Sequence, residues 1–224
     1  MKNNQKLSSV DIHPRGIPER IIIWLHGLGA DGNDFAPIVP ELHLPDTLNI
    51  KYIFPHAPVM PVTINNGYEM RAWFDIQHPD LSLNIDHSGI EQSIKSINTL
   101  IHEEIDQGIA PENIMLAGFS QGAVIATLTG ILFSERLAGV IALSGLLPNA
   151  EPIINQGSPA NRNLPIFMGH GTQDQIVPLV FGEAAHQILV KANYPVEWHT
   201  YPMAHSVCPQ EIMDISNWIQ KIWI

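Results

Sequence analysis

One serine in this sequence has neighbours that could turn it into a nucleophile. Ser120 is the centre of the pattern Gly118-x-Ser120-x-Gly122, and the apolar run 114–116 precedes it. Such glycines flank a serine where a sharp strand-to-helix turn leaves no room for side chains. Residues 121 to about 133 are apolar enough for a buried helix, whose N-terminal end would direct free N–H groups at the serine. The pattern predicts a nucleophilic serine, with a purely structural turn as the alternative.

Two further residues could complete the chemistry, because a serine hydroxyl needs a histidine base that a carboxylate orients. Asp174 lies in a loop after an expected strand, and His205 lies after the next strand and before the last expected helix. Open α/β sheets place their sites at the carboxyl ends of strands. Taken separately, Asp174 could be a surface acid and His205 a helix cap. Taken together, the order Ser120, Asp174, His205 is typical of a catalytic triad.

A glycine-rich loop at residues 26–32 follows the first expected central strand. Its three glycines would let the backbone approach a ligand closely, and its place after a strand suits a contribution to an oxyanion hole. A flexible connection without a catalytic role is the alternative for this loop taken alone.

Apolar runs that suit buried strands alternate with segments of helical periodicity along the chain. The expected strands are residues 21–25, 50–54, 114–117, 139–143, 164–168 and 196–201, with at most a short edge strand at 10–12. The expected helices are residues 33 or 34 to 42, 88–107, 121–133, 180–192 and one that begins near 209. This alternation predicts a single α/β domain over residues 1–224, with a mostly parallel central sheet and helices on both faces.

Two segments are expected to lack regular structure. Residues 148–163 are polar and loop-like, whereas residues 55–75 are rich in Pro and Asn but also carry apolar side chains such as Ile64 and Trp73. Loops of such length in compact domains are usually functional or disordered. The apolar content of 55–75 favours a lid or acyl-binding flap, and a plain cover over the core is the alternative.

Composition excludes several classes of function. The formal charge of −11 disfavours nucleic acid as a partner, and no run of eighteen apolar residues occurs, so we expect no stable membrane insertion. Cys208 is the only cysteine, which agrees with a reducing compartment, and we expect a cytoplasmic protein. The eleven histidines show no metal-ligand spacing, so no metal site is expected.

Several motifs in order resemble the phospholipase/carboxylesterase family of α/β-hydrolases, the group that includes the acyl-protein thioesterases. The resemblance covers nearly the whole chain and is carried by residues 25–35, 54–58, 71–75, 118–122, 170–174 and 201–205. It implies the α/β-hydrolase fold and the roles that follow: triad Ser120, Asp174 and His205, oxyanion-hole N–H groups of Leu28 and Gln121, and acyl-pocket neighbours Trp73 and Ile176. Ala123 departs from the family, which usually has a second glycine there.

The resemblance also implies an activity, namely hydrolysis of esters or thioesters of apolar acyl chains through an acyl-enzyme, with no cofactor. The substrate would be a small-molecule ester or an acylated molecule, and the main activity could instead be that of an acyl-protein thioesterase or a lysophospholipase. A non-catalytic hydrolase-fold ligand-binding protein is the alternative from another class. Cys208 is disfavoured as a nucleophile because it lies only three residues from His205. A monomer and a homodimer both remain open.

Overall fold

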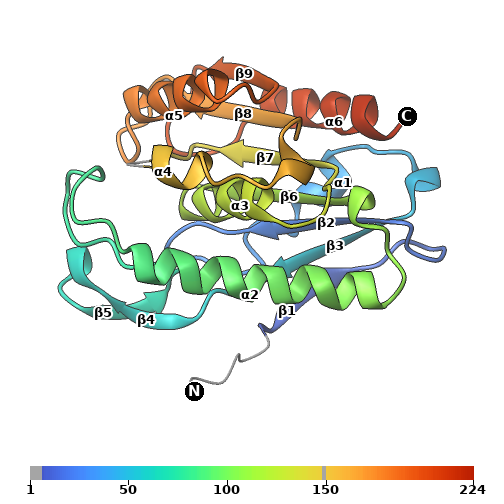
Figure 1. Cartoon of the computed structure of the whole chain (residues 1–224), viewed down its shortest axis with the longest axis horizontal. Helices are drawn as coiled ribbons and strands as arrows, with labels where there is room; N and C mark the ends of the chain where they lie inside the picture. Colours follow the sequence, from blue (N-terminus) through green and yellow to red (C-terminus); the bar gives the residue numbers. More distant parts are fainter. Residues whose placement is uncertain (1–6, 148–149) are drawn as a thin grey trace.

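The apolar runs of the sequence form the strands of a seven-stranded sheet in the computed structural model, which describes residues 7–147 and 150–224 (Figure 1). The strand order is β1-β3-β2-β6-β7-β8-β9; β1 is antiparallel to β3 and the other neighbours are parallel. The strands are β1 Ser9–Ile12, β2 Arg20–Leu25, β3 Ile50–Pro55, β6 Ile114–Phe119, β7 Gly139–Leu143, β8 Ile166–Gly171 and β9 Val196–Tyr201. All predicted strands, including the short edge strand, are confirmed.

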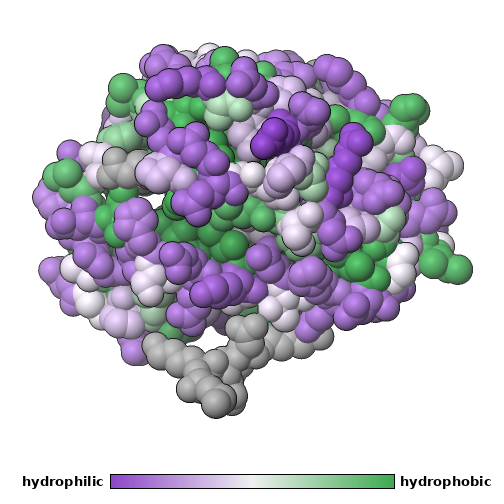
Figure 2. All heavy atoms as spheres, in the orientation of Figure 1, coloured by the Kyte–Doolittle hydropathy of each residue, from purple (hydrophilic) through white to green (hydrophobic). Residues whose placement is uncertain are grey.

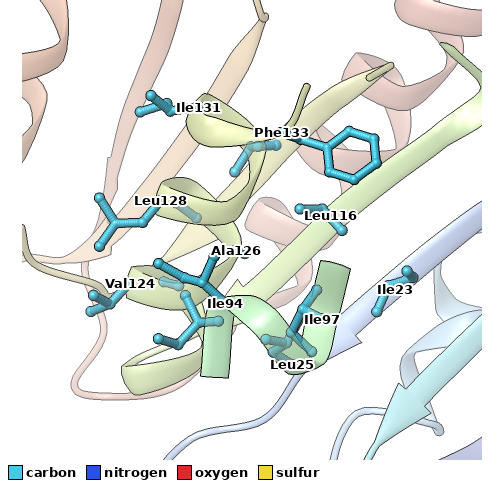
Figure 3. Packing of buried hydrophobic residues seen from close by; sticks show 14 of the residues in the cluster. Ile23, Leu25, Ile94, Ile97, Leu116, Val124, Ala126, Leu128, Ile131 and Phe133 are labelled. Carbon is cyan, nitrogen blue, oxygen red and sulfur yellow. The ribbon is translucent and has the colours of Figure 1, made fainter. Parts of the chain in front are cut away.

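Side chains of the central strands point alternately to the two faces of the sheet, as the period of a strand requires. Ile23 and Leu25 of β2 pack into one core with residues of α2 and α3, whereas Trp24 packs into a second core on the opposite face. Figure 3 shows the first core, in which Leu116 of β6 lies among side chains from both helices. Strands buried on both faces explain why their sequence is continuously apolar.

Helices cover both faces of the sheet, as predicted. Those that pack into the first core are α2 His87–Asp106, α3 Gln121–Leu132, α4 Glu151–Ile154 and α5 Leu179–Lys191. Those that pack into the second core are α1 Ile38–Glu41 and α6 Pro209–Trp223. Short 3₁₀ turns are η1 Asp46–Leu48, η2 Thr63–Asn65, η3 Pro111–Asn113 and η4 Pro159–Asn161. Figure 2 shows the molecule from the side of α2, α3 and α4. Polar residues cover most of this side, and hydrophobic residues gather between α4 and α2.

The helix predicted from residue 33 or 34 to 42 is wrong in its extent, because only α1, Ile38–Glu41, is α-helical. Pro37 and Pro40 interrupt this stretch, and proline lacks the N–H donor and disfavours helical geometry in the residue before it. In the segment 148–163, Pro148 and Asn149 lie outside the described residues. The remainder is largely irregular, as predicted, but contains the single helical turns α4 and η4.

The expectation that residues 55–75 are irregular is also wrong. They form an antiparallel hairpin of β4, Val59–Val62, and β5, Tyr68–Arg71, which is a sheet of its own. The chain reverses through Asn66 and Gly67, whose φ angles of 56° and 75° lie in the left-handed region that these residue types tolerate. Among the described residues, no helix is long and apolar enough to cross a bilayer.

A buried amide far from the candidate site gives a test of the fold. Asn161 accepts the Leu137 N–H and donates to the carbonyls of Phe133 and Glu135 at 3.0, 2.8 and 2.8 Å. We expect Asn161→Ala to lower the free energy of unfolding by about 2–4 kcal/mol, because the partners are left unsatisfied. Urea denaturation measures this loss. The exposed Asn163→Ala is the control; equal stability of both variants would contradict the prediction.

Candidate active site

Ser120 sits in the strained turn that the sequence predicts between β6 and α3. Its φ of 56° and ψ of −118° are unusual for a residue with a side chain, and its N–H donates to the Leu143 carbonyl at 2.9 Å. A Cβ on Gly118 would overlap the carbonyl of Gly122, and a Cβ on Gly122 would overlap the carbonyl of Leu25. Both glycines are therefore required for β6, α3 and β2 to approach one another at the serine.

Asp174 and His205, which lie 31 residues apart in the sequence, form a hydrogen-bonded pair. Nδ1 of His205 lies 2.7 Å from Oδ2 of Asp174, while Oδ1 of the buried Asp174 accepts the N–H groups of Ile176 and Val177 at 2.9 and 2.8 Å. The carboxylate is thus held by its own loop and orients the imidazole. With Nδ1 donating to Asp174, Nε2 of His205 is left with the lone pair of a base.

Ser120 and His205 line one cavity of about 520 Å³, which brings the predicted nucleophile and base to the same space. Leu28, Gln121 and Ile176 also line it. Ile176 is 67% exposed and therefore lies at the mouth rather than in the depth. Five of the residues predicted for the site thus face one cavity, with Asp174 buried behind the imidazole.

Trp73 is the exception, because it lies behind the cavity wall. It is 2% exposed, its indole N–H donates to the His26 carbonyl at 2.9 Å, and its carbonyl accepts the Ser93 hydroxyl. Gln121 clamps the same segment: its Oε1 accepts the Trp73 N–H at 3.1 Å and its Nε2 donates to the Phe74 carbonyl at 2.8 Å. Phe74 is the residue that lines the cavity, so Trp73 fixes the wall instead of forming it.

Two backbone N–H groups near Ser120 are free to bind an anion. Within residues 7–147 and 150–224, neither the Leu28 N–H nor the Gln121 N–H has an intramolecular acceptor. Gln121 is the first residue of α3, where N–H groups lack helical partners and the helix dipole is positive. A Cβ on Gly27 would lie 3.4 Å from Cβ of Ser120, so the loop that carries Leu28 passes directly beside the serine.

The walls of the cavity are mainly apolar, and part of them comes from a segment that the sequence analysis did not assign to the site. Residues 76–86 connect the segment 55–75, called the hairpin segment below, to α2. A bridge between Ile76 and Ile85 closes them into a loop. Apolar side chains that line the cavity are Ile64, Phe74, Ile76, Leu81, Leu83, Ile85, Ile90, Val124 and Leu146. The sequence signal for the end of this loop is Asp86, a residue type that favours the N-cap of a helix. Asp86 caps α2 and also accepts the Asp75 N–H at 3.0 Å.

Another buried carboxyl does not line the cavity that Ser120 faces. Glu211 in the first turn of α6 is fully buried, and its carboxyl lies against Gly169 of β8. Burial raises the pKa of Glu211 to about 8. α6 begins at Pro209, four residues after His205, so the proton on Glu211 affects how firmly this part of the fold is held.

The sequence of the chain is similar to that of known proteins over most of its length. Residues 9–223 match the family model for phospholipase/carboxylesterase. The chain is 38% identical to acyl-protein thioesterase 1 of Cryptococcus neoformans over 96% of this chain and 97% of the relative, and 36% identical to carboxylesterase SOBER1 of Arabidopsis thaliana over 89% of both.

Solved structures agree with these sequence matches. The crystal structure of Arabidopsis thaliana SOBER1 superposes with a TM-score of 0.86 at 35% identity, over 91% of this chain and 98% of that one. That of Zea mays acyl-protein thioesterase 2 gives a TM-score of 0.84 at 27% identity, over 97% and 99%. The predicted α/β-hydrolase fold is confirmed.

The buried Glu211 predicts how stability depends on pH. Between its ordinary pKa of 4.5 in the unfolded chain and about 8 in the fold, the folded protein holds a proton that the unfolded chain has released, so stability falls as pH rises. Glu211→Gln removes this dependence. We expect the variant to gain on the order of 1 kcal/mol per pH unit relative to wild type between about pH 5 and 8.

Urea denaturation at several pH values measures this difference between the two proteins. The exposed Glu91→Gln on α2 is the matched control. Curves of stability against pH that run parallel for wild type and Glu211→Gln would refute the assignment.

Proposed function

The chain belongs to the phospholipase/carboxylesterase family and is a hydrolase that acts on esters, and we propose that Ser120, His205 and Asp174 are its catalytic triad. The observation that carries this proposal is the 2.7 Å contact between His205 and Asp174, together with Ser120 on the same cavity as His205. The strained backbone of Ser120 further supports it, since strain of this kind gathers at functional sites.

The proposed reaction transfers an acyl group to water in two steps. His205 takes the proton of the Ser120 hydroxyl as the oxygen attacks the substrate carbonyl, and then gives it to the leaving group. Water, activated by the same imidazole, hydrolyses the resulting acyl-enzyme. The N–H groups of Leu28 and Gln121 stabilise the oxyanion, each by on the order of 3 kcal/mol, and no metal or organic cofactor takes part.

The cavity supports an apolar acyl chain as the group that is transferred. Its apolar walls extend from Ser120 to Ile64 of η2 and Ile90 of α2, which leaves room for hydrocarbon beyond the reacting carbonyl. Relatives named acyl-protein thioesterase and carboxylesterase support both thioesters and oxygen esters as substrates. In this proposal the segment 55–75, which contains the hairpin, is a lid-like wall of a single catalytic domain, with Trp73 holding it and Ile176 at the entrance.

Other aspects of the protein stay predictions from the sequence. We propose a cytoplasmic location, supported by Cys208 as the only cysteine, and a substrate rather than nucleic acid as the partner of this acidic chain. Both a monomer and a homodimer are compatible with the proposal.

Ser120→Ala tests the triad directly. We expect kcat for p-nitrophenyl esters to fall by up to about 10⁶-fold, because the nucleophile is lost, while the circular dichroism spectrum stays that of wild type. The esters are compared from acetate to long acyl chains. Retention of most activity by the variant would remove Ser120 from the mechanism, and inactivity of both proteins would favour a hydrolase-fold binding protein.

Ile64 and Tyr68 offer a matched test of the acyl site. Both are on the hairpin segment, but Ile64 lines the cavity and the 71% exposed Tyr68 does not. We expect Ile64→Ala to lower kcat/KM for long-chain esters by about 3- to 10-fold, since part of an apolar contact is lost, and to leave acetate hydrolysis unchanged. Tyr68→Ala should change neither. Equal effects of the two substitutions would show that the acyl chain lies elsewhere.

A further inference from the structure

A buried histidine beside Ser120 has no part in the proposed triad, yet both of its ring nitrogens are engaged. His26 follows β2 directly and is 1% exposed. Its Nε2 accepts the Ala57 N–H at 3.0 Å, and its Nδ1 lies 2.7 Å from the Gly27 carbonyl oxygen. Because a backbone N–H can only donate, Nε2 must carry the lone pair, and Nδ1 must carry the proton and donate to Gly27.

The neutral ring that this arrangement needs agrees with its surroundings. Burial lowers the pKa of His26, which favours the uncharged imidazole. The indole of Trp73 lies against the ring, with centroids 5.3 Å apart, and donates to the His26 carbonyl. His26 is therefore fixed both through its backbone and through its side chain.

The hydrogen bond from His26 to the Gly27 carbonyl holds the peptide that carries the Leu28 N–H of the proposed site. The Gly27 carbonyl and the Leu28 N–H belong to one planar trans peptide, so fixing the direction of the oxygen also fixes the direction of the hydrogen. We propose that His26 is a positioning residue which, through the Gly27–Leu28 peptide, aims the Leu28 N–H at the oxyanion. This inference rests on the proposed function, in which Leu28 is an oxyanion-hole donor.

Arg71 of the hairpin segment binds both Ala57, the partner of the His26 ring, and Gly29, the residue after Leu28. The Arg71 guanidinium donates to the Ala57 carbonyl at 2.8 Å, and the Arg71 carbonyl accepts the Gly29 N–H at 2.8 Å. The loop at residues 26–29 is thus tied on one side through the His26 ring and on the other through Gly29. A donor fixed in this way needs no reorganisation when charge develops on the substrate oxygen.

The two ring contacts can be separated by substitution. In Asn, the side-chain amide nitrogen comes close to the place of Nδ1 and can donate to Gly27, but nothing reaches Ala57. In Gln, the amide oxygen comes close to the place of Nε2 and can accept from Ala57, but no donor reaches Gly27. His26→Asn and His26→Gln each lose one hydrogen bond between this side chain and the backbone, so they form a matched pair.

We expect the pair to differ in kcat and to agree in stability. His26→Gln should lower kcat for a p-nitrophenyl ester by about 10- to 100-fold with little change in KM, because the oxyanion forms only in the transition state; removal of a whole donor costs about 10²–10³. His26→Asn should stay within a few-fold of wild type. Thermal denaturation should show a similar fall in Tm for both.

Equal losses of kcat in both variants, in proportion to their losses of Tm, would overturn the proposal and assign His26 to stability alone. If neither variant folds, the ¹⁵N chemical shifts of the backbone-assigned His26 in wild type decide: a proton on Nδ1 supports the proposal, and one on Nε2 overturns it. Failure of the triad would look different, because wild type would then be inactive or Ser120→Ala would remain active.

Discussion

The close approach of α3 to the end of β2 is the constraint on which the rest of the site depends. Gly122 touches the carbonyl of Leu25, and this contact exists only because no side chain intervenes. It places the first turn of α3 under the loop that follows β2, so that Ser120, the Gln121 N–H and the Leu28 N–H share one cavity. The positive φ of Ser120 costs on the order of 1–3 kcal/mol, which the burial of α3 from Gln121 through Ile131 offsets.

The first residue of α3, Gln121, also holds part of the cavity wall in place. The Gln121 backbone contributes a free N–H, while its side chain clamps the segment at Trp73 and Phe74. A shift of this residue would therefore disturb the proposed oxyanion donor and the wall of the proposed acyl site together. The hairpin segment in turn supports the loop after β2 through Arg71 and Ala57. Two parts of the chain that are separate in the sequence thus hold one another in place.

Much of this fold follows from the sequence because its central strands are buried on both faces and therefore read as continuous apolar runs. The proposed triad follows from the sequence for a related reason: Ser120 and Asp174 come after such runs, His205 comes after the edge strand β9, and parallel strands bring their carboxyl ends together. The hairpin at 59–71 is hard to predict because Pro61 lies within one of its strands, although Asn66-Gly67 is a turn signal. Proline is tolerated there since this is a two-stranded sheet with edges on both sides.

Backbone donors are harder to infer from sequence than side-chain bases, and the loop proposed to carry the oxyanion donor shows why. Any residue at position 28 would carry an N–H, so the identity of Leu28 says nothing about the direction of that bond. The direction depends on the Gly27 carbonyl, which contacts the ring of His26, whose other nitrogen binds Ala57 about thirty residues away. Information on the proposed oxyanion donor therefore lies in residues that do not line the cavity. In a site of this kind, residues that position a backbone donor are found by following hydrogen bonds outward from the peptide proposed to bind the oxyanion.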